Sequence, residues 1–299
     1  MEETLKVLES SLSQTKWRLK SASKRRLETD VLALCMGMRA VIMVDYGGKM
    51  PELQERLCAF LKLSQKESSI FEHLRVMVIE DMIYLIHVTG LAEFVKISLD
   101  SETEMQFVDL EQDPPKMISQ AEKSSLIMQL VSIQKLFSLV FPADGKNNDL
   151  VPCHRTDSKT NAESSIVEQS TSQSSEFIDL SSCMQDTQVT VPTLNGWLLG
   201  YPVVYLFGKE HIADAIYNLS TKSLHLFKIL VCRNGTSSKG FCEELTSFSV
   251  PFDLSLEGSN EPWAEAFLAS MQAKWERCKQ VWTSLQMEVS GCYPQAIVL

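Results

Sequence analysis

The chain has 299 residues, of which 44% are hydrophobic and 22% are charged, and this composition excludes wholesale disorder. It carries 28 Lys and Arg residues against 38 Asp and Glu residues. The net charge of −10 argues against nucleic-acid binding, which requires positive charge. No apolar run approaches the ~20 residues that a membrane-spanning helix needs. We therefore expect a globular protein without a transmembrane segment.

Residues 1–25 predict a short N-terminal helix and a basic linker. Leucines at positions 5, 8 and 12 have helical spacing, and six basic residues without an acid follow between positions 16 and 26. The basic cluster is either a solvated link between two helices or a patch for an anionic surface or for nuclear import. Because the first residues are acidic and lack the apolar core of a signal peptide, we expect a soluble intracellular protein, cytoplasmic or nuclear.

Residues 26–142 predict the first half of an α/β domain. Apolar residues at three- and four-residue steps indicate helices, and continuous apolar runs rich in β-branched residues indicate strands buried on both faces. Two such runs, separated by Glu80 and Asp81, predict a hairpin. The expected helices cover residues 26–38, 51–61, 91–97 and 117–140, and the expected strands cover residues 40–44, 74–79, 82–88 and 106–110.

Residues 143–192 differ in composition from the rest of the chain. They contain nine Ser, five Thr and eight acidic residues against three basic ones, with almost no apolar periodicity. Such a segment cannot bury enough apolar surface to offset the conformational entropy that is lost on folding. We predict a disordered, acidic, Ser/Thr-rich insert with one short interaction element at Phe177–Leu180.

Residues 193–299 predict the second half of the same domain. A short helix from Thr193 ends at Gly200, because glycine favours the left-handed backbone that terminates helices. Neither half alone has both a complete sheet and covering helices. We therefore predict a single mixed β-sheet covered by helices and interrupted by the insert. The remaining expected elements are strands over 203–207, 224–231 and 245–250, a last helix with apolar residues from Trp263 to Trp282, and a terminal strand over 296–299.

Eight cysteines are spread along the chain without the close spacing of a zinc site. Their even number permits disulfides, but a chain of this length does not need them in order to fold. We predict reduced cysteines that behave as small hydrophobic residues, and neither a bound metal nor a cofactor.

One stretch of the second half carries a resemblance to a known family. Gly196–Tyr205 resembles the signature stretch of an uncharacterised animal family, that of the human chromosome 1 open reading frame 74 protein. The strand over 41–45 that leads into Pro51, the segment Ser247–Pro251 and the ending Pro294–Leu299 agree with the same family. The insert is longer than expected for the mammalian members. The resemblance implies no catalytic residue, ligand or activity.

Asp45 is the most suggestive single residue. It follows the buried strand over 40–44 and precedes Gly47, Gly48 and the helix that begins at Pro51. In open α/β sheets, ligands bind at the carboxyl ends of strands, and glycines let backbone N–H groups approach an anion near a helix N-terminus. The alternative is a structural turn in which Asp45 accepts backbone hydrogen bonds.

Asp109 also ends a predicted strand. If the strands of Asp45 and Asp109 are neighbours, their two carboxylates lie at one edge of the sheet and can share a magnesium ion, but the sequence pattern leaves the strand order open. The aromatic stripe from Trp263 to Trp282 is either core or a partner surface.

The chain contains no serine-elbow, zinc-protease or Walker pattern. The sequence therefore favours a non-catalytic protein that acts by interaction with an unknown protein partner. The alternative is a hydrolase or a phosphate-ligand-binding α/β protein whose site contains Asp45, Gly47 and Gly48.

Overall fold

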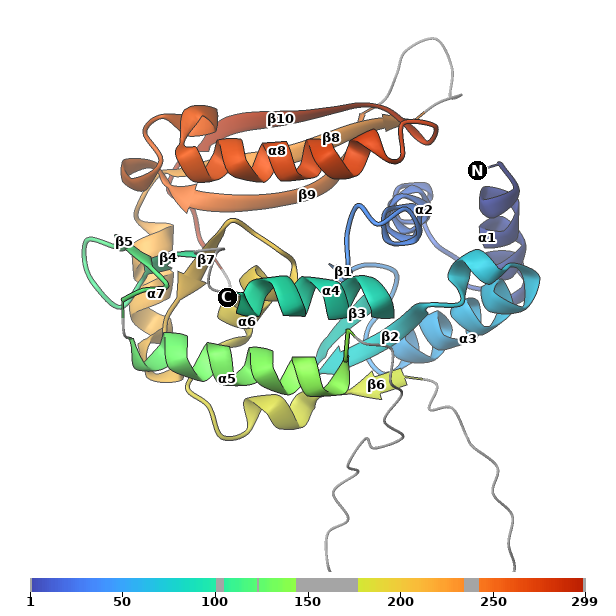
Figure 1. Ribbon diagram of the computed structural model, residues 1–299, viewed down its shortest axis with the longest axis horizontal. Helices are drawn as coiled ribbons and strands as arrows, with labels where there is room; N and C mark the ends of the chain where they lie inside the picture. The colour runs from blue at the N-terminus through green and yellow to red at the C-terminus, as the bar shows by residue number, and fades with distance from the viewer. Residues whose placement is uncertain (1, 101–104, 123, 144–176, 234–241, 298–299) are drawn as a thin grey trace, which may run out of the picture.

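The computed structural model describes residues 2–100, 105–122, 124–143, 177–233 and 242–297 (Figure 1). Its α-helices are α1 (Glu2–Gln14), α2 (Ser21–Cys35), α3 (Glu52–Glu67), α4 (Val88–Leu99), α5 (Ser125–Val140), α6 (Val191–Leu198), α7 (Ile212–Ser220) and α8 (Pro262–Glu276). Its strands are β1 (Val41–Met43), β2 (Leu74–Ile79), β3 (Met82–His87), β4 (Gln106–Asp109), β5 (Lys116–Ser119), β6 (Phe177–Asp179), β7 (Val203–Leu206), β8 (Leu224–Arg233), β9 (Cys242–Pro251) and β10 (Trp282–Cys292).

The strands form three separate sheets, so the prediction of a single mixed sheet is wrong. The first sheet has the order β1-β3-β2-β6, the second has the order β5-β4-β7, and the third has the order β10-β8-β9. Helices α4, α5 and α6 share one apolar cluster with side chains of both the first and the second sheet. These helices therefore pack against strands of both sheets.

The hairpin predicted over residues 74–88 is confirmed. β2 and β3 pair antiparallel, with Ile79 opposite Met82 across a two-residue turn. Glu80 in that turn has φ +54°, a left-handed conformation that is uncommon for a residue with a side chain. Its N–H donates a 2.8 Å hydrogen bond to Oγ of Ser181, which fastens the turn to a segment one hundred residues later in the chain.

The second part of the predicted insert is folded. Phe177–Asp179 forms β6, which pairs parallel with residues 76–78 of β2. A short 3-10 helix, Ser181–Met184, follows, and two of its residues, Cys183 and Met184, are buried. The short element predicted at Phe177–Leu180 is therefore part of the fold, because β6 adds a strand to the first sheet. Residues 144–176 of the predicted insert lie outside the described residues.

The end of the chain differs from the prediction. Helix α8 ends at Glu276, and Trp282 begins the eleven-residue strand β10, where a continuous helix to Trp282 is expected from the apolar spacing. β10 pairs antiparallel with β8, and α8 packs across the apolar face of this third sheet (Figure 1). In the predicted terminal strand over 296–299, Ala296 and Ile297 are not part of a strand, and residues 298–299 lie outside the described residues. Within the described ranges, no helix combines the length and apolarity needed to cross a membrane.

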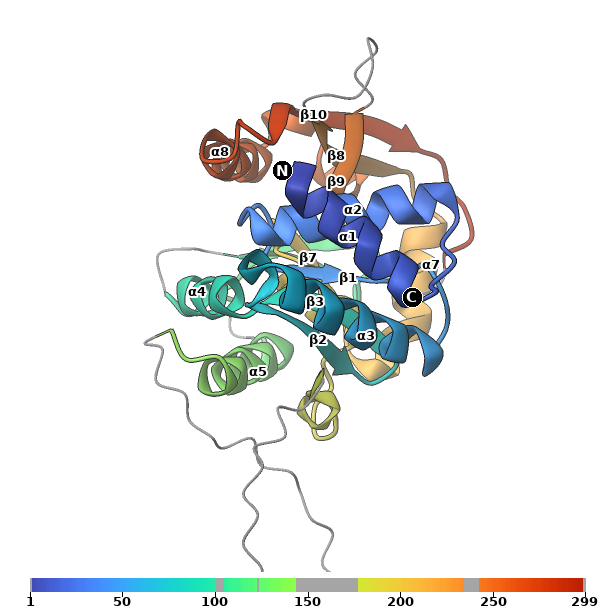
Figure 2. The same cartoon turned by 90° about the vertical axis from the view of Figure 1, so that its right-hand side faces the viewer.

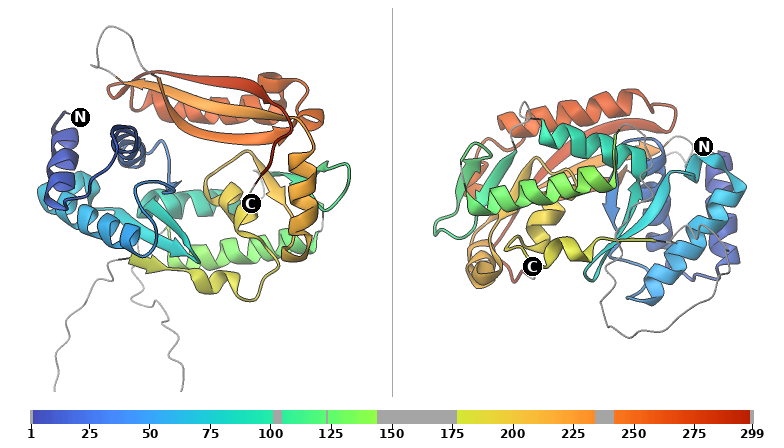
Figure 3. Two further views of the ribbon diagram at one scale, coloured as in Figure 1. Left: turned by 180° about the vertical axis from the view of Figure 1, so that it is seen from behind. Right: turned by 60° about the horizontal axis from the view of Figure 1, so that its bottom comes forward.

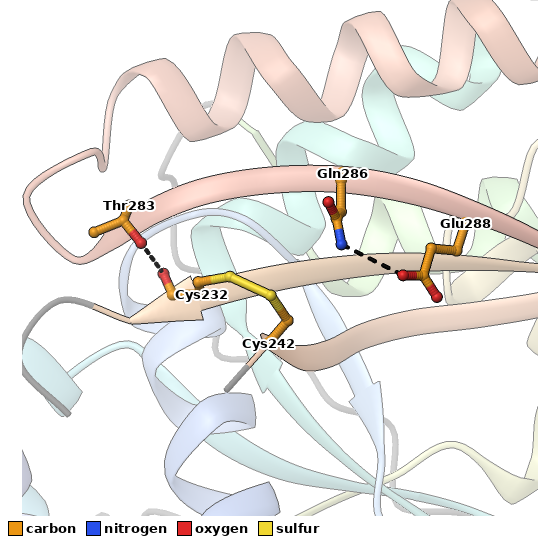
Figure 4. Close-up of a disulfide and its surroundings, with 5 residues drawn as sticks. All are labelled: Cys232, Cys242, Thr283, Gln286 and Glu288. Atoms are coloured by element: carbon orange, nitrogen blue, oxygen red, sulfur yellow. Dashed lines mark hydrogen bonds between the residues drawn. A yellow bond between two sulfur atoms is a disulfide. The ribbon is translucent and has the colours of Figure 1, made fainter. Parts of the chain in front are cut away.

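A disulfide joins Cys232 of β8 to Cys242 of β9, so the prediction of uniformly reduced cysteines is wrong for this pair (Figure 4). The two residues are ten positions apart in the sequence but directly opposite in the antiparallel register. The hairpin between β8 and β9 creates this proximity, which cysteine spacing alone does not reveal. The other cysteines in the described ranges are Cys35, Cys58, Cys183, Cys278 and Cys292.

Candidate functional site

The turn that carries Asp45, Gly47 and Gly48 lies between β1 and α3. Asp45 is exposed, and the carbonyl of Gly47 accepts a 2.9 Å hydrogen bond from the indole N–H of Trp17. Gly47 has φ +85°, and a Cβ atom at this position would lie 2.8 Å from side-chain atoms of both Trp17 and Leu19. The N-terminal segment therefore fills the space beside Gly47, where an anion is expected to approach in a phosphate site.

Asp109 ends β4 in the second sheet, whereas β1 belongs to the first, so Asp45 and Asp109 are not on neighbouring strands. The Asp109 carboxylate accepts hydrogen bonds from the N–H of Glu111 at 3.0 Å and from the side-chain amide of Gln112 at 2.5 Å. A polar cavity of about 290 Å³ lies beside these residues and the start of α5. Among the residues that the structure describes, no group of three or more His, Cys, Asp or Glu side chains is arranged to hold a metal ion.

Asp30 is a buried acid that the sequence patterns do not single out. Its Oδ2 atom accepts hydrogen bonds from the hydroxyl of Tyr46 at 2.7 Å and from Nε of Arg26 at 3.2 Å. Burial raises the pKa of the Asp30 carboxyl, although the Arg26 guanidinium and the Tyr46 hydroxyl oppose this effect. The hydrogen bond with Tyr46 anchors α2 to the turn after β1. Since Asp30 is 0% exposed, its carboxylate is not accessible to a substrate.

Arg39 links this region to two distant parts of the chain. It is 9% exposed, and its guanidinium donates hydrogen bonds to the carbonyls of Leu199 after α6, at 3.1 Å, and Leu245 in β9, at 3.0 Å. Burial lowers the pKa of the Arg39 guanidinium. The same burial, partly opposed by Arg39, raises the pKa of the Tyr201 hydroxyl nearby. Arg39 thus fixes the position of the segment after α6 against the first sheet and the third.

An apolar groove of about 540 Å³ lies between α4, the segment that follows α6, and α8. Ser98 and Gln106 supply the main polar side chains around it. Figures 1 and 2 show α4, α5 and α8 on the same side of the molecule. The lining consists of Phe94, Ile97, Ser98, Met105, Gln106, Trp197, Gly200, Tyr201, Pro202, Pro262, Trp263, Ala266 and Phe267.

The floor of the groove is built around Trp197 of α6. This side chain is 1% exposed, and its ring packs against Phe94 of α4 at 5.8 Å and, edge to face, against Phe137 of α5 at 5.3 Å between centroids. A Cβ atom on Gly196 would lie 2.9 Å from Val204, so this glycine lets α6 lie directly on β7. Gly200 has φ +68°, which confirms the predicted glycine stop of this helix.

Trp263 and Phe267 form the α8 wall of the groove. The Trp263 ring lies 5.0 Å from the Phe227 ring, and the Phe267 ring lies 5.5 Å from the Phe248 ring, so both side chains pack on the third sheet. Both are only half-buried, because their remaining surface lines the groove. The sequence allows the aromatic stripe to be core or partner surface, and these two residues both contribute to the core and line the groove.

The groove combines apolar surface with few hydrogen-bonding groups, and its volume lies within the ~300–1,000 Å³ range of ligand sites. Such a lining suits the binding of apolar groups. Sequence reasoning did not find it, because the lining residues at 94–98 and 105–106, at 197–202 and at 262–267 are far apart in the chain and meet only in the folded protein. Each segment by itself has the pattern of an ordinary buried element.

Among the comparisons with known proteins, a family model matches nearly the whole chain. This model is described as Domain of unknown function (DUF4504) and matches residues 9–299. No curated protein and no solved structure gives a significant match. The matched range includes the three sheets, the turn at Asp45 and every residue that lines the groove. The chain therefore belongs to the family described as Domain of unknown function (DUF4504).

Proposed function

We propose that this protein acts by non-catalytic binding of a partner protein, and that the groove between α4 and α8 receives the apolar face of a partner helix. The supporting observation is the half-exposed aromatic lining supplied by Trp263 and Phe267. Aromatic side chains of this kind concentrate binding energy at interfaces, because they bury a large area at low entropic cost.

The shape of the site favours a helix as the occupant. The groove is open to the surface and is flanked by two helices, which is the arrangement in which amphipathic helices bind through residues at i, i+3 or i+4, and i+7. Its apolar surface extends to Ile97, which is 57% exposed on the α4 rim. On the α8 rim the exposed lining residues are Pro262 and Ala266, and the small side chain of Ala266 lets a partner backbone approach closely.

The helices that flank the groove expose charged side chains, which can contact polar residues of a partner helix. Glu93 and Lys96 are exposed on α4, and Glu265 is exposed on α8. Because both signs are present, the rim does not select for a strongly acidic or strongly basic segment. The apolar anchors therefore set the affinity, and the charged rim sets orientation.

Selection from a displayed library of random short peptides tests this function. We expect enriched sequences to carry apolar residues at helical spacing and to bind the parent protein. Ile97→Glu places a charge on the apolar rim, and we expect it to reduce affinity for these peptides at least tenfold. Trp263→Ala removes part of the α8 wall and should act in the same direction, although it also removes packing against Phe227.

A matched control separates the groove from general effects of charge. Tyr217 is exposed to the same extent as Ile97, 57% for both, but lies on α7 and is not part of the groove lining. Tyr217→Glu should leave peptide binding unchanged. Peptides that bind both variants equally well, or a selection without enriched sequences, would contradict the proposal.

We also propose that the family is that of the human chromosome 1 open reading frame 74 protein, supported by Gly196–Tyr205, which forms much of the groove floor and the adjacent strand. A cytoplasmic or nuclear location stays a prediction. The alternative, a hydrolase or phosphate-ligand protein with a site at Asp45, Gly47 and Gly48, also stays a prediction. Thermal-shift measurements with nucleotides, sugar phosphates and divalent cations test it, because a ligand of the folded state raises the unfolding midpoint.

A further inference from the structure

β10 forms one edge of the third sheet and has hydrogen-bonded strand partners on one side. In the order β10-β8-β9, only β8 pairs with it among the described strands. The strand is eleven residues long, and Figures 1 and 3 show it along the rim of the molecule. The opposite edge of this sheet is covered, because Arg26 and Arg39 donate hydrogen bonds to carbonyl groups of β9.

Apart from an irregular register between Trp282 and Ser284 and contacts with the 3-10 helix Gly258–Asn260, the β10 edge lacks the features that normally block pairing with another chain. Its eleven residues, Trp282–Cys292, contain no proline and no lysine, and Glu288 is the one charged residue among them. Exposed edges of this length usually carry such features, since unpaired N–H and C=O groups recruit other strands. The side chains of Leu285, Met287 and Val289 are half-buried and lie on the face of the sheet that α8 covers.

We infer that two copies of this chain associate through β10, which pairs antiparallel with β10 of the second copy around a two-fold axis at Met287. The register of β10 is irregular between Trp282 and Ser284, and an axis at Met287 pairs the regular stretch Ser284–Ser290 with the same residues of the second copy. The result is a continuous six-stranded sheet, with three strands from each copy. The interface is isologous, as is usual in homodimers.

This register also matches the side chains on both faces of the sheet. On the face that α8 covers, Leu285 lies opposite Val289 of the second copy, and Met287 lies opposite itself. On the other face, Gln286 lies opposite Glu288 of the second copy, so the two glutamates do not face each other. Gln286 and Glu288 are exposed on this face, and within one chain the amide of Gln286 donates a 3.4 Å hydrogen bond to the Glu288 carboxylate (Figure 4).

The alternation of apolar and polar side chains along β10 excludes a register that is shifted by one residue in either direction. Cross-strand neighbours in an antiparallel pair point to the same face, so a shift of one residue would place apolar side chains opposite polar ones. A shift that moves the two-fold axis to Glu288 would place two glutamates opposite each other, which is destabilising. The register centred on Met287 therefore combines pairing over Ser284–Ser290, apolar matching and the absence of like-charge contact.

Charge substitutions at Gln286 test the register in solution. Sedimentation equilibrium of the full chain should show a monomer–dimer equilibrium in the micromolar range. Gln286→Glu creates two symmetry-related like-charge pairs with Glu288 and should weaken the dimer roughly 2- to 30-fold. Gln286→Lys creates two opposite-charge pairs and should strengthen it. Gln272→Glu and Gln272→Lys, on an exposed position of α8, should leave the dissociation constant unchanged.

A cysteine at the two-fold axis gives an independent readout. Met287→Cys places two thiols opposite each other at a cross-strand distance that disulfides span, so mild oxidation should yield a covalent dimer. Gln272→Cys serves as the control for random cross-linking and should stay monomeric on a denaturing gel. A parent protein that remains monomeric across the micromolar range, or a dimer that responds equally to Glu and Lys at position 286, would overturn the inference.

Discussion

The hydroxyl of Tyr46 and the Oδ2 atom of Asp30 lie 2.7 Å apart, and the hydrogen bond between them joins the turn after β1 to the buried side of α2. Arg26, four residues before Asp30 on the same helix, donates to the same oxygen. The other carboxylate oxygen of Asp30 has no hydrogen-bond partner among the described residues. The hydrogen bonds from Tyr46 and Arg26 therefore supply most of the stabilisation of the buried Asp30 carboxylate.

Tyr46→Phe tests the first donor. The substitution keeps the ring and removes the hydroxyl, and hydrogen bonds to charged groups contribute about 1.5–3 kcal/mol to stability. We expect the free energy of unfolding, measured by urea denaturation, to fall by about that amount. Tyr217→Phe is the control, because Tyr217 is 57% exposed and the same deletion there should cost little. Equal effects of the two substitutions would contradict a special role for the Tyr46 hydroxyl.

The pH dependence of stability tests the state of Asp30. Burial raises the pKa of this carboxyl, so the folded protein retains the proton at pH values where the unfolded chain, with an aspartate pKa of about 3.9, has lost it. The contribution of Asp30 to the free energy of unfolding therefore falls as pH rises through this window.

Asp30→Asn does not titrate at this position and removes that dependence. The stability of the parent relative to Asp30→Asn should decrease as the pH rises above about 3.9, the aspartate pKa of the unfolded chain, as measured by denaturation of both proteins in parallel. Subtracting the two curves cancels the contributions of the other titrating groups. A difference that is constant or that increases with pH would show that the folded protein does not raise the pKa of Asp30.

Alanine substitutions at two glycines distinguish the free-energy cost of backbone strain from that of a steric clash. Gly37 and Gly47 both have positive φ, +70° and +85°, but a Cβ atom at Gly37 meets nothing within 4 Å, whereas at Gly47 it lies 2.8 Å from Trp17 and Leu19. Gly37→Ala should cost about 1–2 kcal/mol from the backbone alone. Gly47→Ala should cost clearly more in the same denaturation experiment. Equal costs would mean that the N-terminal segment does not pack on the turn.

The disulfide between Cys232 and Cys242 closes the connection between β8 and β9. Disulfides typically add about 2–4 kcal/mol by restricting the unfolded chain. Replacing both cysteines with serine should lower the free energy of unfolding by about this amount. Dithiothreitol should lower the stability of the parent to a similar extent and leave the double variant unchanged. A parent protein that is insensitive to the reductant would argue that the bond is not formed in solution.

The local elements of the fold follow directly from the sequence. The hairpin of β2 and β3 is readable because two apolar runs stand two residues apart, and the end of α6 is readable because Gly200 supplies the left-handed backbone. The last helix is different. Trp275 and Trp282 are seven residues apart, which fits two helical turns, yet the chain turns after Glu276 and the Trp275 indole donates to the carbonyl of Trp282. The spacing is compatible with both structures.

The division into three sheets was not predictable from these patterns. A buried apolar run such as β4 shows that its faces are covered, but it does not identify the neighbouring strand. β4 pairs parallel with β7, about one hundred residues later, while β1 pairs with β3. The candidate groove is inaccessible to sequence reasoning for the same reason, because Phe94, Trp197 and Trp263 become neighbours only through this long-range pairing.

The parallel pairs β2–β6 and β4–β7 have a consequence for the protein during its synthesis. When the ribosome has completed α5, β2 and β4 are present, but β6 and β7 are not, since they follow residues 144–176 in the chain. At about 5–20 residues per second, several seconds pass before these strands emerge. During that interval the nascent chain exposes two strand edges and the apolar faces of α4 and α5. Nascent chains that end before residue 177 should therefore be strong clients of chaperones, and residues 26–142 produced alone should aggregate.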